Sequence, residues 1–343
     1  MEDKKKDLVF GVNTCTELDE FQIANYLVTF AGGHIVSRFF SSLYQLGIFE
    51  QFKDDQPKHY KDIAKIVGCD PECLHNVMKF FLPYKLFKEV SLGTYTKTST
   101  TKLFMKGGKL YNFMDFITSD KNYILHKNFI ETLRTGQSKA PEAIGCNNFY
   151  ESFSDPVWEK SFTNSMEAFN DISFPNILEN VDFSPYKTIV DVGGSHGNLI
   201  RQLLRKYPSI QKGINFDLPD VIKGKVNEER LEFVSGTFFK SVPRGDCMIL
   251  KSILHNWKDE DVKVILQNCS NSLEDGGHLY IFDFMVDPQK FNHHVLWIDI
   301  TMRHFFGAKE RSLEEIETLI QGKFKIHKVI KEVYMGCIVL TKI

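Results

Sequence analysis

The chain has 343 residues, of which 43% are apolar and 25% charged, a composition typical of globular proteins with ordinary cores. The chain has 42 Lys and Arg residues and 44 Asp and Glu residues, which gives a formal charge of −2. This balance excludes the overall excess of basic residues that is typical of proteins that bind nucleic acids or membrane surfaces. No run approaches the roughly 20 apolar residues of a membrane span. The basic start "MEDKKKDLVF" lacks a signal-peptide core and the seven cysteines are scattered, so we expect a cytoplasmic protein with reduced thiols and, from its length, two domains.

The first part of the chain predicts helices followed by a β-wing. Apolar residues recur at helical spacing over residues 21–52, and residues 60–84 are typical of two short helices separated by Gly68 and "DP". The segment "LFKEVSLGTYTKT" alternates around a glycine turn, which indicates two strands. Together these elements predict a winged-helix domain over residues 1–107, bounded by the glycine pair in "KGGKL".

A winged helix often binds DNA, so one alternative is a DNA-binding regulator with a ligand-sensing second domain. The second helix, "ECLHNVMKFFLPY", is apolar on most faces and offers one Lys and one His. A helix that enters a DNA groove needs several cations and amides. We therefore favour a buried scaffold or dimerisation helix and no nucleic-acid partner, and a salt-dependent gel shift would revive the alternative.

Residues 108–343 are predicted to form the second domain. Its first part, residues 108–182, is helical and rich in Phe, Met and Trp, a composition typical of a core or of a pocket wall for a flat ligand. Apolar strands then alternate with helices, which indicates a mostly parallel sheet covered on both faces. The predicted strands are 187–192, 213–218, 231–236, 246–254 and 278–286, and the predicted helices are 198–208, 259–273 and 312–321. Two successive strands, 324–333 and 336–343, predict a terminal antiparallel hairpin at the sheet edge.

The turn in "TIVDVGGSHGNLI" is the strongest binding signal in this domain. Gly193, Gly194 and Gly197 allow a ligand to approach the backbone at the end of a strand. Their spacing differs from the G-x-G-x-x-G of dinucleotide sites, and Asp191 would repel a pyrophosphate but suits an ammonium group. Asp217, at the end of the next strand, can accept both hydroxyls of a ribose. An ammonium group and a ribose without a pyrophosphate describe S-adenosylmethionine.

Four further segments resemble the motifs of plant-type small-molecule O-methyltransferases, which act on caffeic acid, flavonoids and hydroxyindoles. They are "DCMILKSILHNWKDED", "ILQNCSNSLEDGG", "FDLPDVI" and "GAKERS", in the family's order. The resemblance extends over nearly the whole chain, because a winged-helix dimerisation domain also belongs to the family. It implies an α/β fold with a Rossmann-like class I methyltransferase sheet, S-adenosylmethionine as cofactor and a homodimer. It also implies methylation of a phenolic hydroxyl on a small aromatic metabolite, of a polyketide or phenylpropanoid type.

The same resemblance implies roles for individual residues. His255 is the general base, and Asp283 and Glu310 are the acids that flank and orient it. The implied cofactor-binding residues are Asp191, Gly193, Gly194, Gly197, Asp217, Leu218, Thr237, Phe238, Lys251 and Trp257. The implied acceptor pocket draws on "FYESF", "NSMEAFNDISF" and "WIDITMRHFFGA" and includes Met166, Asp299 and Met302.

The chain departs from the family's pattern at several positions. Thr237 and Phe238 stand where the family has Asp-Met, so one contact to the adenine amino group is missing or remade. Asp283 is one methylene shorter than the usual Glu, which leaves its reach to His255 open. Asn256 replaces an Asp, and Ser195 replaces a Gly in the turn.

The chemistry explains why a histidine is needed. A phenol with a pKa of about 10 is ionised about one part in a thousand at pH 7, whereas an ordinary histidine is largely neutral and can remove the proton, an effect of about 10²–10⁴-fold. An acid on the other ring nitrogen fixes the tautomer. The cofactor is already activated, so the scheme needs no metal. A third hypothesis keeps the cofactor but redirects the chemistry, and the intact His255 argues against it.

Overall fold

The computed structural model describes residues 8–9, 12–13, 19–173, 178–289, 292–331 and 335–343. Its backbone packs into two compact units, one made of residues 1–124 and 153–172 and the other of 125–152 and 173–343. The predicted boundary at residue 107 divides the chain by sequence pattern rather than by packing, and it stays a prediction. Residues 174–177, inside the predicted helical part 108–182, and residues 332–333, at the end of the predicted strand 324–333, lie outside the described residues.

The first unit contains the predicted helices and wing. Its sheet has the order β3-β5-β4, and the hairpin β4–β5 follows α3 and α4 as predicted. A core rich in Phe and Tyr lies beneath the helices. The helices are α1 (Glu20–Ala31), α2 (Gly33–Gln45), η1 (Phe49–Phe52), α3 (Tyr60–Val67), α4 (Pro71–Phe80), α5 (Ser99–Phe104), α6 (Tyr111–Ile117), α7 (Asp120–Leu125) and α9 (Pro156–Ser173). The strands are β1 (Leu8–Val9), β2 (Val12–Asn13), β3 (Lys58–His59), β4 (Phe87–Ser91) and β5 (Thr94–Lys97).

The sequence explains the break between α3 and α4 and the early end of α4. Gly68 ends α3 in the left-handed conformation, with φ of 73°, and the Asp70 side chain caps α4 by accepting from the Cys73 N–H. The predicted second helix ran to residue 84, but α4 ends at Phe80. Pro83 has no N–H and disfavours helical geometry in the residue before it, so the helix cannot continue.

The second unit is built on a sheet of seven strands in the order β11-β12-β10-β9-β6-β7-β8. Strands β6 to β10 are parallel, and β12 runs antiparallel to both β10 and β11, which confirms the predicted fold and its terminal hairpin. The strands are β6 (Thr188–Val192), β7 (Lys212–Asp217), β8 (Leu231–Ser235), β9 (Gly245–Lys251), β10 (Leu273–Asp283), β11 (Phe324–Ile330) and β12 (Gly336–Lys342). The helices are η2 (His126–Asn128), α8 (Phe129–Thr135), η3 (Pro141–Ile144), η4 (Phe149–Ser154), α11 (Asn198–Lys206), η5 (Leu254–Asn256), α12 (Asp259–Ser272), α13 (His293–Phe306) and α14 (Leu313–Leu319).

The clearest differences from the prediction in this unit concern two strands and one helix. Strand β9 ends at Lys251 instead of residue 254, because Leu254 belongs to the 3₁₀ turn η5. Strand β10 begins at Leu273 instead of residue 278 and ends at Asp283, because Leu273 pairs with Gly245 ahead of a register shift. Helix α13 was not predicted. Its sequence, "HHVLWIDITMRHFF", is rich in β-branched and aromatic residues, which are not strong helix formers, and the structure starts it with an Asn292 cap and ends it at a left-handed Gly307.

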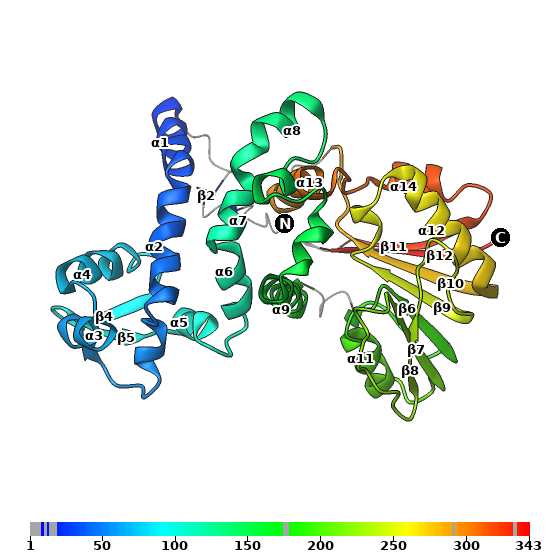
Figure 1. Ribbon diagram of the computed structural model, residues 1–343, viewed down its shortest axis with the longest axis horizontal. Helices are drawn as coiled ribbons and strands as arrows, with labels where there is room; N and C mark the ends of the chain where they lie inside the picture. The colour runs from blue at the N-terminus through cyan, green and yellow to red at the C-terminus, as the bar shows by residue number, and fades with distance from the viewer. Residues whose placement is uncertain (1–7, 10–11, 14–18, 174–177, 290–291, 332–334) are drawn as a thin grey trace, which may run out of the picture. The chain divides into compact units, whose positions relative to one another are not determined.

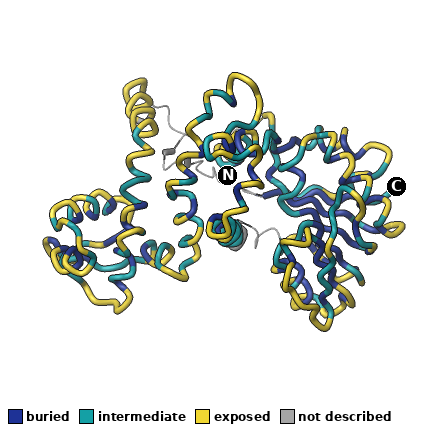
Figure 2. Tube along the Cα trace, viewed as in Figure 1, coloured by how far each residue is buried: buried dark blue, intermediate teal, exposed yellow. Residues whose placement is uncertain are grey.

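The sheet is covered by helices and holds the buried core. Apolar residues of α12 and α14 pack with those of the strands into one cluster, and Figure 2 shows the strands as the mainly buried part of this unit. Helix α11 packs on β7 where Gly213 leaves space, since a Cβ there would lie 2.7 Å from Ile200 Cγ1. In Figure 1, β6 lies between β9 and β7, and the strand order reverses at this point. Ligands of such sheets bind outside the carboxyl ends of the strands at this switch point.

Among the helices in the part of the chain that the structure describes, none combines the length and the apolar character that crossing a bilayer requires.

Candidate active site

Charged residues predicted from the sequence meet at the carboxyl edge of the sheet. Asp191 lies near the end of β6, and Asp217, Lys251 and Asp283 are the last residues of β7, β9 and β10. These strands are neighbours on both sides of the switch point. The parallel topology therefore gathers residues that are far apart in the sequence into one site.

The glycine turn after β6 is held against the end of β7. Gly193 adopts a φ of 76°, and a Cβ there would lie 2.4 Å from Ile253 Cδ1. Ser195 also lies in the left-handed region, with φ of 51°, which is uncommon for a serine. Its N–H donates to Asp217 Oδ2 at 2.8 Å, and the Leu218 N–H donates to Asp217 Oδ1 at 2.7 Å. The Asp217 carboxylate is therefore fixed by the backbone on both of its oxygens.

Two buried oxygens converge beside Gly194. Among the described residues, Asp191 Oδ2 and Asn215 Oδ1 have no hydrogen-bond partner, and a Cβ on Gly194 would lie 2.7 Å and 2.2 Å from them. The Asn215 amide nitrogen donates to the Ser195 carbonyl at 2.8 Å, which turns its oxygen toward Gly194. Burial raises the pKa of Asp191 to about 7, although Lys251 opposes the rise. Acceptors without donors fit an ammonium group, which has only donors.

Asn215 was not predicted as a site residue. A signal for it was present, because it is a polar residue among apolar neighbours in the strand "GINFDL", ahead of Asp217 at the strand end. A buried amide in such a strand needs partners.

Substituting Gly194 tests this cradle. We expect Gly194→Ala to weaken S-adenosylmethionine binding by roughly ten- to hundredfold, about 1–3 kcal/mol, because the new methyl group would overlap both oxygens. Titration calorimetry measures the affinity, and thermal melting checks the fold. Gly33→Ala is the control, since its Cβ would meet nothing within 4 Å. An unchanged affinity in Gly194→Ala would contradict the cradle.

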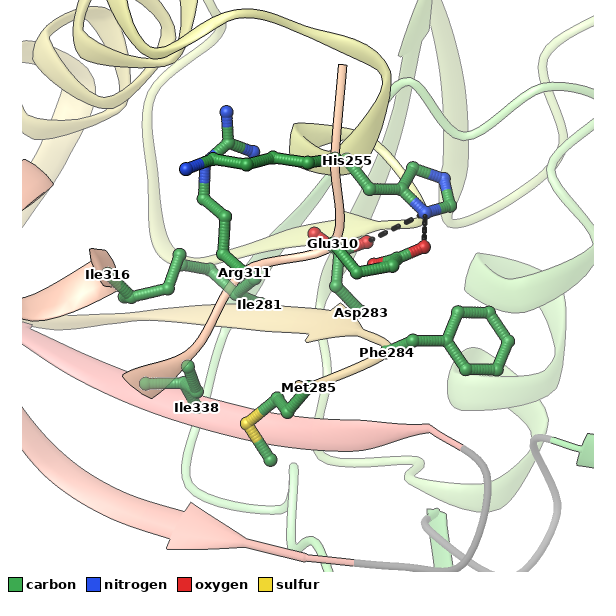
Figure 3. Close-up of a pocket in the computed structure, with 10 residues that line it drawn as sticks. His255, Ile281, Asp283, Phe284, Met285, Glu310, Arg311, Ile316 and Ile338 are labelled. Carbon is green, nitrogen blue, oxygen red and sulfur yellow. Dashed lines mark hydrogen bonds and ion pairs between the residues drawn. The ribbon is translucent and has the colours of Figure 1, made fainter. Parts of the chain in front are cut away.

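His255 lies on η5, between β9 and α12, and contacts one of the two predicted acids. Its Nδ1 and Glu310 Oε1 are 2.6 Å apart, whereas Asp283 Oδ1 is 4.0 Å from the same nitrogen. The His255 and Glu310 side chains are 10% and 0% exposed. Figure 3 shows both carboxylates near the same ring nitrogen. Asp283 is thus too distant for a hydrogen bond, which is consistent with its missing methylene. With the proton on Nδ1, the lone pair of Nε2 is the basic one.

A small cavity adjoins these carboxylates. Figure 3 shows most of the side chains that line it, including His255, Asp283 and Glu310. Its remaining lining residues are Ile281, Phe284, Met285, Lys309, Arg311, Ile316 and Ile338.

The charges around His255 favour its protonated form. Burial by itself lowers the pKa of His255, but the carboxylates of Glu310 and Asp283 outweigh this effect and raise it to about 9. Burial raises the pKa of Asp283 to about 7, opposed first by His255. Burial also lowers the pKa of Lys251, while Asp191 and Asp283 act in the opposite direction. Only the neutral imidazole can accept a proton, and the neutral fraction of His255 increases as the pH rises.

A cluster of aromatic rings surrounds Trp257, two residues after His255 in the sequence. The Trp257 ring packs edge-on against Phe238 and Phe239, with centroids 5.8 Å and 4.7 Å away, and lies nearly parallel to Tyr150 at 6.1 Å. Thr237 Oγ1 accepts from the Phe239 N–H at 3.3 Å. Burial and the charge of Asp217 raise the pKa of Tyr150. The structure thus brings Phe238 and Trp257 together and adds Tyr150, from the predicted pocket segment "FYESF".

The three predicted acceptor-pocket residues are in different situations. Asp299 Oδ1 accepts from the Glu310 N–H at 2.9 Å, and Asp299 Oδ2 pairs with Arg303 at 3.1 Å, so this carboxylate braces the segment that carries Glu310. Met302 is half-buried on α13. Met166 lies on α9, in the first unit. All three acceptor roles stay predictions.

No metal centre was found in the described ranges. Within residues 8–9, 12–13, 19–173, 178–289, 292–331 and 335–343, no group of three or more His, Cys, Asp or Glu residues is placed to hold a metal ion.

Family models match both parts of the chain. The model of an O-methyltransferase domain matches residues 126–324, which include His255, Asp283, Glu310 and the glycine turn. The chain belongs to the O-methyltransferase family. The model of the O-methyltransferase dimerisation domain matches residues 28–107. Membership confirms the resemblance found in the sequence, together with the predicted activity of an S-adenosylmethionine-dependent O-methyltransferase.

The relatives of this O-methyltransferase cover nearly its whole length. It is 37% identical to O-methyltransferase 12 of Dictyostelium discoideum, over 99% of this chain and 90% of that protein. It is 29% identical to flavonoid 4′-O-methyltransferase 4 of Mentha piperita, over 88% and 92% of the two chains. The structure of human N-acetylserotonin methyltransferase in complex with S-adenosylmethionine superposes with a TM-score of 0.85 over 95% and 99%, at 20% identity. This last likeness confirms the fold.

Proposed function

We propose that this O-methyltransferase methylates a phenolic hydroxyl of a small aromatic metabolite and that His255 removes the phenolic proton. The contact of 2.6 Å between His255 Nδ1 and Glu310 Oε1 carries the proposal, because it leaves Nε2 as the proton acceptor. S-adenosylmethionine supplies a methyl group that is already activated as a sulfonium. The protein must then make the oxygen nucleophilic, and positioned general bases contribute about 10²–10⁴-fold.

The buried acids Glu310 and Asp283 set how strong a base His255 is, because they stabilise the imidazolium that forms when it accepts a proton. The imidazolium form of His255 is stabilised by Glu310 and Asp283, which raise its pKa. A base whose conjugate acid has a pKa of about 9 is well matched to a phenol with a pKa of about 10. An aliphatic alcohol is a far weaker acid and would not be deprotonated to a useful extent. The electrostatics of the site therefore support a phenol as the acceptor.

The comparisons and the aromatic residues also support a flat phenolic acceptor. A relative from Mentha piperita is named as a flavonoid 4′-O-methyltransferase, and a 4′ hydroxyl on the flavonoid ring is a phenol. Tyr150, from the predicted acceptor-pocket segment "FYESF", supplies an aromatic ring of the kind that packs on a flat acceptor. Whether the acceptor is of a polyketide or a phenylpropanoid type stays a prediction.

The residues at the edge of the sheet fit the cofactor's polar groups. In the proposed arrangement Asp191 and Asn215 accept from its ammonium group, and Asp217 accepts from the ribose hydroxyls. Trp257 and Phe238 would pack near the adenine, where Thr237 and Phe238 replace the family's Asp-Met. The orphan oxygens of Asp191 and Asn215 support this assignment most directly.

We also propose that the protein is a homodimer. The dimerisation model matches residues 28–107, and the apolar side chains of α1 are open to solvent in the single chain. Phe21, Leu27 and Val28 are 75%, 63% and 70% exposed. An apolar helix of this kind needs a partner surface. Helix α4 carries Glu72 in its first turn and Lys79 in its last turn, and their charges cancel. It therefore lacks the positive charge that binding to the DNA phosphates would need.

A panel of acceptors tests the proposed substrate class. With radiolabelled S-adenosylmethionine, we expect methyl transfer to phenols and at least roughly hundredfold less to benzyl alcohols of the same size, because a base of this strength deprotonates only the phenols. Matched pairs differ by one methylene between ring and oxygen, so shape is nearly constant. Equal turnover of the two members of a pair would contradict the phenolic assignment, as would turnover of anilines alone.

A further inference from the structure

Arg311 is a buried cation that contacts the backbone around His255. It is 4% exposed, and its Nη1 donates to the Leu254 carbonyl at 2.7 Å. Its Nη2 donates to the Trp257 carbonyl at 2.7 Å, and Nε and Nη2 both donate to Asp259 Oδ1, at 3.0 Å and 2.8 Å. The guanidinium therefore connects the 3₁₀ turn η5 with the start of α12.

The two carbonyls that it contacts bracket the base. His255 is the middle residue of η5, a turn of three residues that Trp257 caps by donating its N–H to the Leu254 carbonyl at 3.1 Å, so Arg311 adds a second donor to that carbonyl and supplies one to the Trp257 carbonyl. Ser252, two residues before this turn and directly after β9, has a φ of 56°, so the backbone enters the turn from an uncommon conformation. A buried turn of this kind keeps its geometry only if its polar groups find partners.

Arg311 also follows Glu310 directly in the sequence. The Glu310 N–H donates to Asp299 Oδ1, and the Val286 N–H donates to the Arg311 carbonyl at 3.2 Å. The backbone of this pair is thus tied to α13 and to the residues after β10. From that fixed segment the Glu310 side chain contacts the His255 ring, while the Arg311 side chain contacts the backbone on both sides of it.

We propose that Arg311 is a positioning residue that sets the distance between His255 and Glu310. The inference rests on the proposed role of His255 as the base. Arg311 holds the turn, and Glu310 holds the ring, from the same two-residue segment. Movement of η5 relative to this segment would lengthen the bond between Nδ1 and Oε1, and a misplacement of 1 Å can cost a catalyst about 10²-fold.

A purely stabilising ion pair with Asp259 explains less of this geometry. The Asp259 side chain is 44% exposed, and ion pairs with exposed partners contribute little. The two carbonyl bonds need a planar fork that reaches both sides of the turn at once. Lysine carries the same charge but has a single nitrogen, so it cannot replace the fork.

The variant Arg311→Lys tests the proposal because it keeps the charge and removes the fork. We expect kcat to fall at least roughly tenfold and the S-adenosylmethionine Kd to stay within about threefold. We also expect the acid limb of the kcat–pH profile to move to lower pH, because a longer bond to Glu310 removes part of what raises the pKa of His255. An unchanged limb and an unchanged kcat would overturn the proposal.

Arg230→Lys is the matched control. Arg230 lies in the same unit and donates to the Ile210 and Leu204 carbonyls at 2.8 Å and 2.7 Å, away from the base. We expect a comparable loss of melting temperature with an unmoved acid limb. The same limb shift in both variants would show a merely structural effect and overturn the proposal. If Arg311→Lys does not fold, Asp259→Asn replaces it, with a smaller shift in the same direction expected and no shift counting against the proposal.

A double variant separates this inference from the proposed function. If Arg311 acts through His255, His255→Ala combined with Arg311→Lys should be no slower than His255→Ala by itself. A further loss in the double variant of the size seen in the single one would show that Arg311 acts independently of the base. Full turnover in His255→Ala would instead refute the proposed base, whatever Arg311→Lys does.

Discussion

Replacing His255 with alanine should remove methyl transfer and spare cofactor binding. The substitution deletes the proton acceptor, and the loss of a general base costs about 10²–10⁴-fold. The cofactor cradle is built separately, from residues at the ends of β6 and β7, and does not depend on the imidazole. Transfer of label from S-adenosylmethionine to a phenol measures the rate, and calorimetry measures the affinity.

The control for this substitution is another histidine of the same unit. His278 lies on β10 and packs edge-on against His327, with a centroid distance of 5.0 Å, five positions before Asp283 in the strand. We expect His278→Ala to retain turnover. Turnover near the wild-type rate in His255→Ala would refute the assignment of the base. Loss of cofactor affinity in the same variant would show that the two sites are not separate.

Glu310→Gln should have the second largest effect, a loss of roughly 10²–10⁴-fold in kcat. The carboxylate accepts from Nδ1 and keeps the proton off Nε2, whereas an amide can donate to Nδ1 and so favour the tautomer in which Nε2 carries the proton. Removing its charge also lowers the pKa of His255, so the remaining activity should have an acid limb at lower pH. A pH–rate profile from about pH 5 to 10 measures both effects.

Asp283→Asn is the comparison for Glu310→Gln. Its carboxylate is 4.0 Å from Nδ1 and acts on the imidazole through space, so we expect a smaller loss of rate and a smaller shift of the limb in the same direction. Equal losses in the two variants would contradict the unequal distances. A shift of the acid limb of the pH–rate profile to higher pH in Glu310→Gln would contradict the electrostatic account of His255.

The same pKa has a consequence for stability. His255 has a folded pKa of about 9 against an ordinary value of 6.5, so its interaction with Glu310 stabilises the fold fully below pH 6.5. This contribution is lost as the pH rises through about 9. The difference in free energy of unfolding between wild type and Glu310→Gln should therefore be largest at acid pH and shrink above pH 9.

Much of this protein could be predicted from local patterns. Alternating strands and helices after Pro185 specify a parallel sheet, and the glycine turn after "TIVDV" predicts where that sheet binds its ligand. Asp191 and Asp217 follow from the same rule, since the carboxyl ends of parallel strands share one edge. The family motif around His255 predicted the proposed base. These features depend on residues close together in the sequence, and so the sequence by itself determined them.

Other features depend on residues that only the fold brings together. His255 and Glu310 are 55 residues apart, and sequence could not decide that Glu310, not Asp283, makes the hydrogen bond. The choice depends on how far the backbone of each acid lies from His255 compared with the length of its side chain, which is one methylene shorter in Asp283. Only the tertiary structure gives those backbone distances. The role of Asn215 beside Gly194 and of Arg311 around η5 likewise comes from packing between separate elements. The sequence determined which groups are present at the edge of the sheet, and the tertiary structure decided which of them touch.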